Sequence, residues 1–141
     1  MLKLFLLCCS AVLAFTAHTT RASSTELVGS EINLIGIVCN TSDQIEYLVG
    51  LMYTGDGIGI EKALEATNAK YPVENDRVCA PQDYPVIAQL EKTDVKTIGN
   101  HLFALYTLKV IAVINGRGNR ITFENPTTVY SYKLLSGQEK I

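Results

Sequence analysis

The sequence predicts an α+β fold, in which an antiparallel sheet of four to five strands carries two short helices on one face, with one disulfide. Two short segments after residue 40 repeat apolar residues with the period of a helix, whereas the second half of the chain alternates with period two between turn signals. Cys39 and Cys79 bracket the two helical segments. Helices that are segregated from hairpin-linked strands in this way are typical of α+β sandwiches.

The N-terminus has the features of a secretory signal. One lysine precedes an uncharged apolar run from residue 4 to residue 15, and a more polar segment follows to Ala22. Cleavage is expected after Ala22, with Ala14 as the alternative position. The apolar run is shorter than the roughly 20 residues that span a bilayer. We therefore expect residues 1–22 to be removed, and the mature protein to be periplasmic or secreted, with no membrane span.

Length and charge indicate one slightly acidic domain. The signal carries two of the 12 basic residues, so cleavage leaves 10 basic against 14 acidic residues, without a cluster of Lys and Arg. A basic groove for nucleic acid is therefore not expected. We divide the mature chain into a flexible lead-in (residues 23–31), a single α+β domain (residues 32–135) and a polar tail (residues 136–141).

The first half of the domain predicts one strand and two helices. Residues 32–38 are short, apolar and rich in β-branched side chains, which indicates a buried strand. A helix follows, because apolar residues recur at i, i+3, i+4 and i+7 from Ile45, and a Gly-Asp-Gly run at residues 55–57 ends it. A second helix repeats the spacing over residues 60–69, and Pro72 cannot continue it.

The start of the first helix offers three N-cap candidates, Asn40, Thr41 and Ser42, because short polar side chains can accept a hydrogen bond from the first turn. Glu46 lies four residues after Ser42 and five after Thr41, so no strict capping box is expected at these caps. The same three residues also form an N-glycosylation sequon, for which a helix cap is the favoured interpretation.

Cys39 and Cys79 are the two cysteines expected to survive processing, since Cys8 and Cys9 lie in the apolar run of the signal. In an oxidising compartment, two cysteines most simply form one structural bridge. A redox pair is disfavoured, because the spacing is unlike a C-x-x-C motif. We predict a disulfide that ties the start of the first helix to a polar, proline-containing loop after the second. Closing a loop of this size stabilises the fold by about 4 kcal/mol.

The second half of the domain predicts strands. Residues 86–90 and 95–98 are short strand candidates, and residues 101–114 form the clearest strand of the chain, with period-two alternation and apolar residues on both faces. A strand of this composition lies centrally in its sheet and is covered at least partly on its second side.

A hairpin connects this strand to the last part of the domain. Residues 115–119 are rich in Gly and Asn, which accept the positive φ angles of tight turns. Residues 121–123 return antiparallel, and residues 129–135 resume the strand after Pro126. A proline there indicates an edge position or a bulge.

No catalytic residue, metal site or cofactor is predicted. The glycine-rich run at residues 55–59 lacks the Lys and Ser/Thr of a phosphate loop, and a loop with a helix start explains it better. His101 is the only histidine expected in the mature chain, and it lies at a strand start, where a structural role is the ordinary finding. One histidine and two bridged cysteines cannot supply the ligands of a zinc site.

Carboxylates leave open the alternative of a small secreted hydrolase. Glu61 and Glu65 lie one turn apart on the second helix and have the pattern of its solvated face. A glycosidase needs two carboxylates that face each other across a cleft, and a distant pair such as Asp43 with Glu124 could meet this need. A concave pocket holding two close acidic side chains would favour this alternative.

The candidate partner surface consists of Tyr130 and Tyr132, near the edge marked by Pro126, and of Arg117 in the hairpin turn. Tyrosine favours interfaces because it buries a large area and keeps a polar group. Half-buried packing of the tyrosines and a solubilising role for the arginine are the ordinary interpretations of the same residues.

Three features carry a resemblance: residues 39–46, residues 63–68, and Cys79 followed by a long apolar strand. Together they resemble small exported bacterial proteins of unknown function, over about residues 34–114. The resemblance implies a periplasmic or secreted location and a shared disulfide-tied fold, without an activity or a site. We therefore expect a small, exported, non-catalytic binding module, envelope-associated or inhibitor-like, whose partner is a protein or an envelope component.

Overall fold

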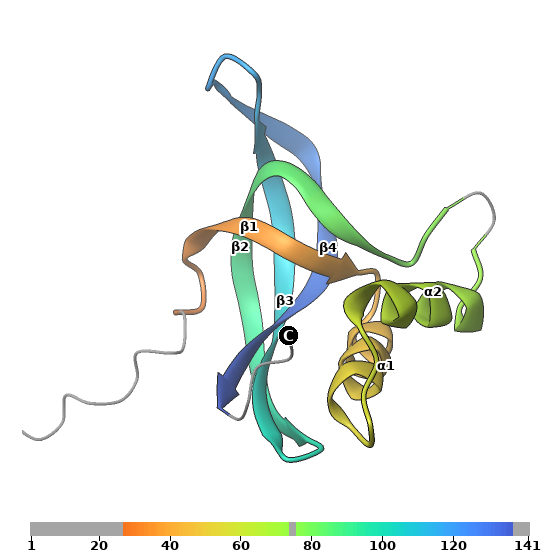
Figure 1. The fold of residues 1–141 in the computed structure, drawn as a ribbon. Coiled ribbons are helices and arrows are strands. Elements are labelled where there is room, and N and C mark those ends of the chain that lie inside the picture. Colours follow the sequence, from red (N-terminus) through yellow and green to blue (C-terminus); the bar gives the residue numbers. More distant parts are fainter. Residues whose placement is uncertain (1–26, 74–75, 137–141) are drawn as a thin grey trace, which may run out of the picture.

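The computed structural model describes residues 27–73 and 76–136, and it has the predicted α+β fold with one disulfide. Its elements are, in order, β1 (Glu31–Cys39), α1 (Ser42–Tyr53), α2 (Ile60–Lys70), β2 (Cys79–Ile98), β3 (His101–Ile114) and β4 (Arg120–Ser136) (Figure 1). The predicted signal at residues 1–22 lies outside the described residues, as does the predicted tail from residue 137 onward.

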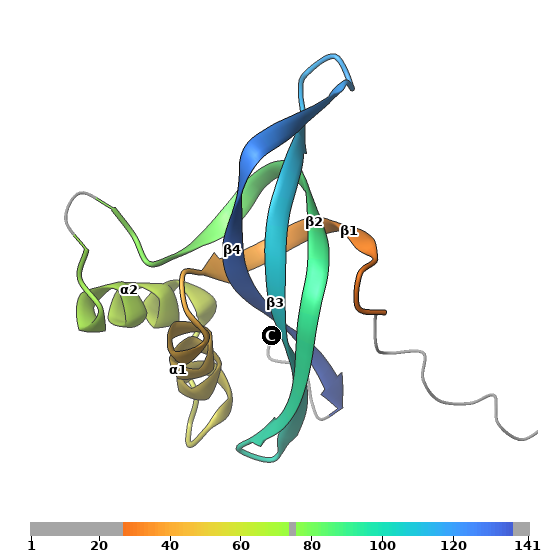
Figure 2. The ribbon, with the colours of Figure 1, turned by 180° about the vertical axis from the view of Figure 1, so that it is seen from behind.

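The four strands form one antiparallel sheet with the neighbour order β1-β2-β3-β4. The sheet closes on itself because Cys39, at the end of β1, also pairs with Tyr130 of β4. Figure 1 and Figure 2 show β1 crossing the long meander of β2, β3 and β4, with α1 and α2 together at one side of it. The position of the helices on one face agrees with the prediction, whereas the closure of the sheet is a feature that the sequence pattern did not indicate.

Strand β3 separates two cores. The helix-side core consists of Cys39, Ile45, Leu48, Val49, Met52, Ala63, Val78, Cys79, Phe103 and Leu105. The β1-side core consists of Leu34, Val86, Ala88, Leu90, Ala104, Tyr106 and Leu108. Because neighbouring residues of a strand point to opposite faces, Phe103 enters the first core and Ala104 the second. This confirms that residues 101–114 form a central strand that is covered on both sides.

Strand β2 is longer than predicted. Residues 79–85 were expected as a polar loop but belong to the strand, and the two short strands predicted at residues 86–90 and 95–98 are parts of it. The loop prediction was wrong because Pro81 and Pro85 were interpreted as residues that exclude a strand. This part of β2 pairs with β1 only, since its pairing with β3 begins at Val86, and a strand with one free edge tolerates proline.

Strand β4 is also continuous, from Arg120 to Ser136. Its pairing with β3 is irregular at one place: Thr127 lies opposite Val110 and Thr122 opposite Ala112, so several β4 residues face a single residue of β3. Pro126 lies within this irregular segment. The prediction of an edge position or a bulge at Pro126 is therefore confirmed as a bulge.

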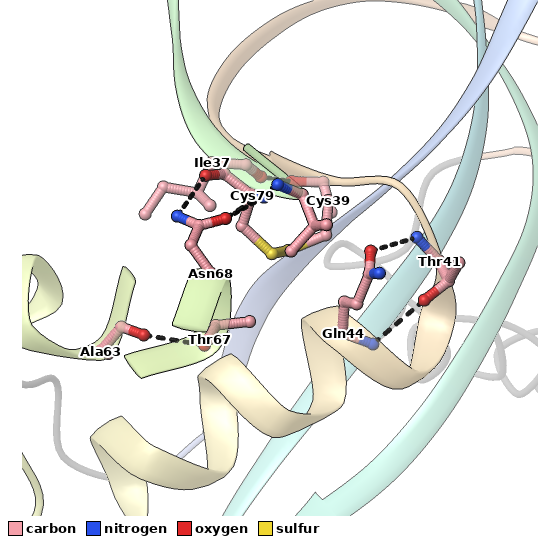
Figure 3. The surroundings of a disulfide bond; sticks show 10 residues. Ile37, Cys39, Thr41, Gln44, Ala63, Thr67, Asn68 and Cys79 are labelled. Atoms are coloured by element: carbon pink, nitrogen blue, oxygen red, sulfur yellow. Dashed lines mark hydrogen bonds between the residues drawn. A yellow bond between two sulfur atoms is a disulfide. The ribbon is translucent and has the colours of Figure 1, made fainter. Parts of the chain in front are cut away.

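The cap of α1 corrects a second prediction. Thr41 is the N-cap, and its hydroxyl accepts a hydrogen bond from the backbone N–H of Gln44 at 3.3 Å. The side-chain oxygen of Gln44 accepts in return from the backbone N–H of Thr41 at 2.9 Å (Figure 3). A complete capping box is present, because Gln44, and not Glu46, stands three residues after the cap.

The end of the predicted flexible lead-in is held by the sheet. Gly29 donates to the carbonyl of Leu90 at 2.7 Å, and Leu90 donates to the carbonyl of Ser30 at 3.0 Å. Strand β1 itself begins at Glu31. Residues 29–31 of the predicted lead-in thus continue the pairing of β1 with β2, and the flexibility of the lead-in stays a prediction.

The predicted disulfide joins Cys39 and Cys79. The two residues lie directly opposite each other in the register of β1 and β2, with their Cα atoms 4.1 Å apart, and both side chains are buried. The bridge thus joins two strand ends, and not a helix start and a loop as predicted. Both helices lie in the segment between these strand ends.

Asn68 attaches α2 to the bridged strands. Its Oδ1 accepts hydrogen bonds from the backbone N–H groups of Val78 and Cys79, at 2.8 and 2.9 Å, and its Nδ2 donates to the carbonyl of Cys79 at 3.0 Å (Figure 3). One residue earlier, the buried hydroxyl of Thr67 donates to the carbonyl of Ala63 at 2.7 Å. The contact between α2 and the sheet therefore has a polar component at the disulfide.

Candidate functional site

The three residues of the predicted partner surface lie in two different environments. Tyr130 and Tyr132 are half-buried and pack against the helix-side core, and the ring of Tyr132 meets that of Phe103 edge to face, with centroids 6.1 Å apart. Arg117 is exposed in the turn between β3 and β4. Tyr130 pairs with Thr107, seven residues before the end of β3. Roughly 20 Å of strand therefore separates the tyrosines from the turn.

The turn that carries Arg117 is ordered by one side chain. The Oδ1 of Asn115 accepts hydrogen bonds from the backbone N–H groups of Arg117 and Asn119, both at 2.9 Å. The backbone of Asn115 donates to the carbonyl of Asn119 and accepts from Gly118, again at 2.9 Å. Gly118 adopts a φ angle of +83°, which a residue without a Cβ accepts easily. Four hydrogen bonds around Asn115 thus hold the turn in one conformation.

The first half of β4 continues this exposed region. Every residue from Gly116 to Thr128 is exposed, and Ile121 and Phe123 leave 48% and 39% of their surface accessible. Figure 1 and Figure 2 show β3 and β4 running beyond the other strands to a turn that projects from the body of the fold. We call residues 114–128 the hairpin arm. The hairpin arm combines exposed apolar side chains with an ordered turn.

An ion pair connects the hairpin arm to β1. Arg120 donates from Nη1 and Nη2 to the two carboxylate oxygens of Glu31, at 2.9 and 3.3 Å. The hydrogen bond from Arg120 lowers the pKa of Glu31, desolvation opposes this effect, and the positive charge of Arg120 adds to it. The same hydrogen bond raises the pKa of Arg120. The pair holds the part of the hairpin arm next to the turn against the start of β1.

His101 lies in a small aromatic cluster. Its ring centroid is 5.1 Å from that of Tyr53 and 6.2 Å from that of Phe103, and the residue is half-buried. Tyr53 also meets Phe103 at 4.9 Å. The cluster lies where the start of β3 meets the end of α1, so the contacts of His101 include packing between sheet and helix.

The acidic residues considered for a hydrolase lie at three separate places in the fold. Glu61 and Glu65 line a surface hollow of about 530 Å³ together with Arg77 and three further residues, Leu64, Asn68 and Pro81. Asp43 lies in the first turn of α1, whereas Glu124 lies in the irregular part of β4, within the hairpin arm. The structure therefore brings Glu61 and Glu65 to one hollow and does not form the pair of Asp43 with Glu124.

The glycine-rich run at residues 55–59 is a loop that ends at the start of α2, as predicted. Within residues 27–73 and 76–136, no three His, Cys, Asp or Glu side chains are placed to hold a metal ion. Neither helix in this part of the chain has the length and apolarity that a membrane crossing requires.

Comparison with known proteins finds no matching family model, no matching curated protein and no matching solved structure. The resemblance to small exported bacterial proteins therefore stays a prediction. The case for a function rests on the geometry of the hairpin arm and of the hollow beside α2.

Sequence reasoning missed two features of the hairpin arm. Asn115 was treated as one of several turn residues, although Asn at the first position of a turn commonly accepts hydrogen bonds from the backbone that follows. Ile121 and Phe123 were treated as part of a strand that returns antiparallel, without a statement about their exposure. Their polar neighbours, Thr122 and Glu124, and the nearby Pro126 were the available signals of an exposed edge.

Proposed function

We propose that the protein is an exported, non-catalytic interaction module that binds a protein partner through the hairpin arm. One observation carries the proposal: four hydrogen bonds fix the turn, while its side chains, and Ile121 and Phe123 behind it, are exposed. A surface that is ordered before binding loses little conformational entropy when the partner docks. Ile121 and Phe123 are two residues apart on one strand, so their side chains lie on the same face, where a partner can cover both together.

Export is part of the same proposal. The signal-like N-terminus and the buried Cys39–Cys79 disulfide support it, because structural disulfides persist in oxidising compartments. A periplasmic or secreted module would meet its partner there, either a protein or another component of the envelope. Intact mass of the protein recovered from cells measures the processing, since removal of residues 1–22 leaves a chain that begins at Ser23.

The test of the interaction uses substitutions that add charge to the apolar side chains of the arm. The folded protein is used as bait against the soluble proteins of its source cells, as wild type and with Ile121→Asp and Phe123→Asp together. We expect the double variant to lose the captured partner. Val95→Asp is the matched control, because Val95 is 53% exposed and pairs with Ala104 near the other end of β3. Capture that survives the double variant but not the control would contradict the role of the arm.

A second candidate, a small carboxylate-dependent hydrolase, is favoured by the hollow that Glu61 and Glu65 line. It ranks second because both carboxylates project from consecutive turns of one helix, whereas a glycosidase places them on opposite sides of the scissile bond. The test is release of reducing ends from chitin and from peptidoglycan. Turnover that disappears in Glu61→Gln or Glu65→Gln would favour the hydrolase, and no turnover by the wild type would reject it for these substrates.

A further inference from the structure

We propose that Arg117 is the anchor of the hairpin arm and that it enters a pocket lined by carboxylates on the partner protein. This inference rests on the proposed function, because it assumes that the arm is the binding surface. It adds the chemistry that the partner must supply.

The turn places one long side chain at its apex. Arg117 stands between Gly116 and Gly118, which have no side chains, and the space next to both glycines is open. Asn115 holds the backbone N–H of Arg117 itself at 2.9 Å. The direction in which the Arg117 side chain leaves the turn is therefore set before any partner arrives. Preorganisation of this kind favours insertion into a concave site.

The charges of the arm favour a small anionic pocket over an extended polyanion. Of the two basic residues in residues 114–128, Arg120 is paired with Glu31. Glu124 adds a negative charge. Among the described residues, Arg117 is thus the one cation of the arm that is in no ion pair of this structure. Binding to nucleic acid or to an anionic lipid surface draws on several cations together, which the arm does not have.

A carboxylate is the natural partner for this group. Guanidinium and carboxylate form two parallel N–H···O hydrogen bonds in one plane, which gives both affinity and orientation. Ile121 and Phe123, on the strand behind the turn, can cover apolar surface at the rim of such a pocket. The partner is therefore expected to be a folded protein with an acidic pocket and an apolar border.

The experiment converts the expected contact into a covalent bond that can be mapped. Arg117→Lys keeps the charge and adds an amine. A carbodiimide activates a carboxylate in direct contact as an O-acylisourea, which the amine attacks to form an amide, and the carbodiimide leaves as its urea with the elements of water. The probe is the soluble protein fraction of the source cells. Arg120→Lys is the matched control, because its new amine faces Glu31 and must give an internal bond. The bonds are located by mass spectrometry of the digested products.

We expect Arg117→Lys to couple to an Asp or Glu of a captured protein, and Arg117→Glu to bind that protein about 30-fold more weakly or worse. Capture that depends on Ile121 and Phe123, with the control bond but no bond from position 117, would overturn the proposal and leave the proposed function standing. A bond to Glu61 or Glu65 of a second copy would show self-association instead. Capture abolished by nuclease would identify a nucleic acid as the occupant. Absence of any capture would overturn both proposals.

Discussion

Asn68 and Asn115 hold backbone groups that helices and strands leave without partners. Each side-chain oxygen accepts two backbone N–H groups, at residues 78 and 79 for Asn68 and at residues 117 and 119 for Asn115. An amide suits this task because it accepts through its oxygen and can donate through its nitrogen. In the sequence, the first lies inside a helix and the second in a turn, and neither position predicts how many groups each side chain will hold.

Gly99 is the residue at which a single added carbon should matter most. It lies in the β2–β3 turn with a φ angle of +65°, and a Cβ there would be 2.5 Å from the carbonyl oxygen of Tyr53 in α1. We expect Gly99→Ala to lower the free energy of unfolding by about 3 kcal/mol, from backbone strain together with the clash. Urea denaturation measures the change.

Gly55 provides the control for the clash. Its φ angle is +60°, but no atom lies within 4 Å of the Cβ that alanine would add. Gly55→Ala should therefore cost about 1 kcal/mol, from backbone strain alone. Equal losses at Gly55 and Gly99 would contradict the close approach of the β2–β3 turn to α1.

Among the elements, α1 shows how one residue decides a helix start. Three neighbouring residues were suitable N-caps, and the hydrogen bonds select Thr41. Thr41→Ala should lower the free energy of unfolding by about 1 kcal/mol, whereas Ser42→Ala, inside the first turn, should change it by less than about 0.5 kcal/mol. Thermal and urea denaturation of both variants test this. A larger loss of stability for Ser42→Ala than for Thr41→Ala would contradict the assignment of Thr41 as the N-cap.

The contribution of the Glu31–Arg120 ion pair to stability should depend on pH. In the folded protein the pKa of Glu31 lies below the ordinary value of 4.5. Its contribution to stability is therefore fully present above pH 4.5 and is lost as the pH falls through the lowered pKa. Glu31→Gln should be less stable than the wild type at pH 7, and the difference should vanish in acid. High salt should also reduce it, because the pair is exposed.

Urea denaturation of both proteins at several pH values measures this difference. Glu124→Gln is the control, since it removes a carboxylate from the same hairpin without breaking an ion pair of the described structure. A difference between Glu31→Gln and the wild type that persists unchanged in acid would show that the Glu31 carboxylate does not act through its charge.

The strands differ in how closely their bounds could be predicted from the sequence. The strand at residues 101–114 was predicted with its observed bounds, because strong alternation on a long segment leaves few other structures open. The segment at residues 79–85 was assigned to a loop, since its prolines and polar residues are the local signature of one. Its strand conformation depends on pairing with β1, which lies about 40 residues earlier in the chain. The sequence of residues 79–85 alone does not show that β1 pairs with them.

At the scale of the whole molecule, the disulfide connects the sheet across the segment that carries both helices. Cys39 and Cys79 are 40 residues apart in the sequence and directly paired in space. Cys39→Ser with Cys79→Ser should lower the free energy of unfolding by about 4 kcal/mol, since the unfolded chain gains the entropy of an open loop. Urea denaturation tests this. Both cysteines are buried, so reductant should act only after unfolding, and fast reduction of the native protein would contradict this burial.

The residues of the candidate site were predicted from the sequence less completely than the fold. Arg117 was named from the sequence as an exposed turn residue, and its exposure is observed. Tyr130 and Tyr132 were named with it, yet they pack against the helix-side core, far along the sheet from the turn. Their separation from Arg117 depends on the register of β3 and β4, which composition and spacing do not specify.

The fold class, the two helices, the central strand and the cysteine pair could be predicted from the amino-acid sequence, because periodicity and helix-stop residues act locally and cysteines can be counted. Three features became visible in the folded structure: the closure of the sheet through Cys39 and Tyr130, the full length of β2 and the exposure of the hairpin arm. These features depend on which distant segments pair and on how far each strand extends past its neighbours. Burial and pairing between remote residues are properties of the packed chain, so they appear only when the whole fold is present.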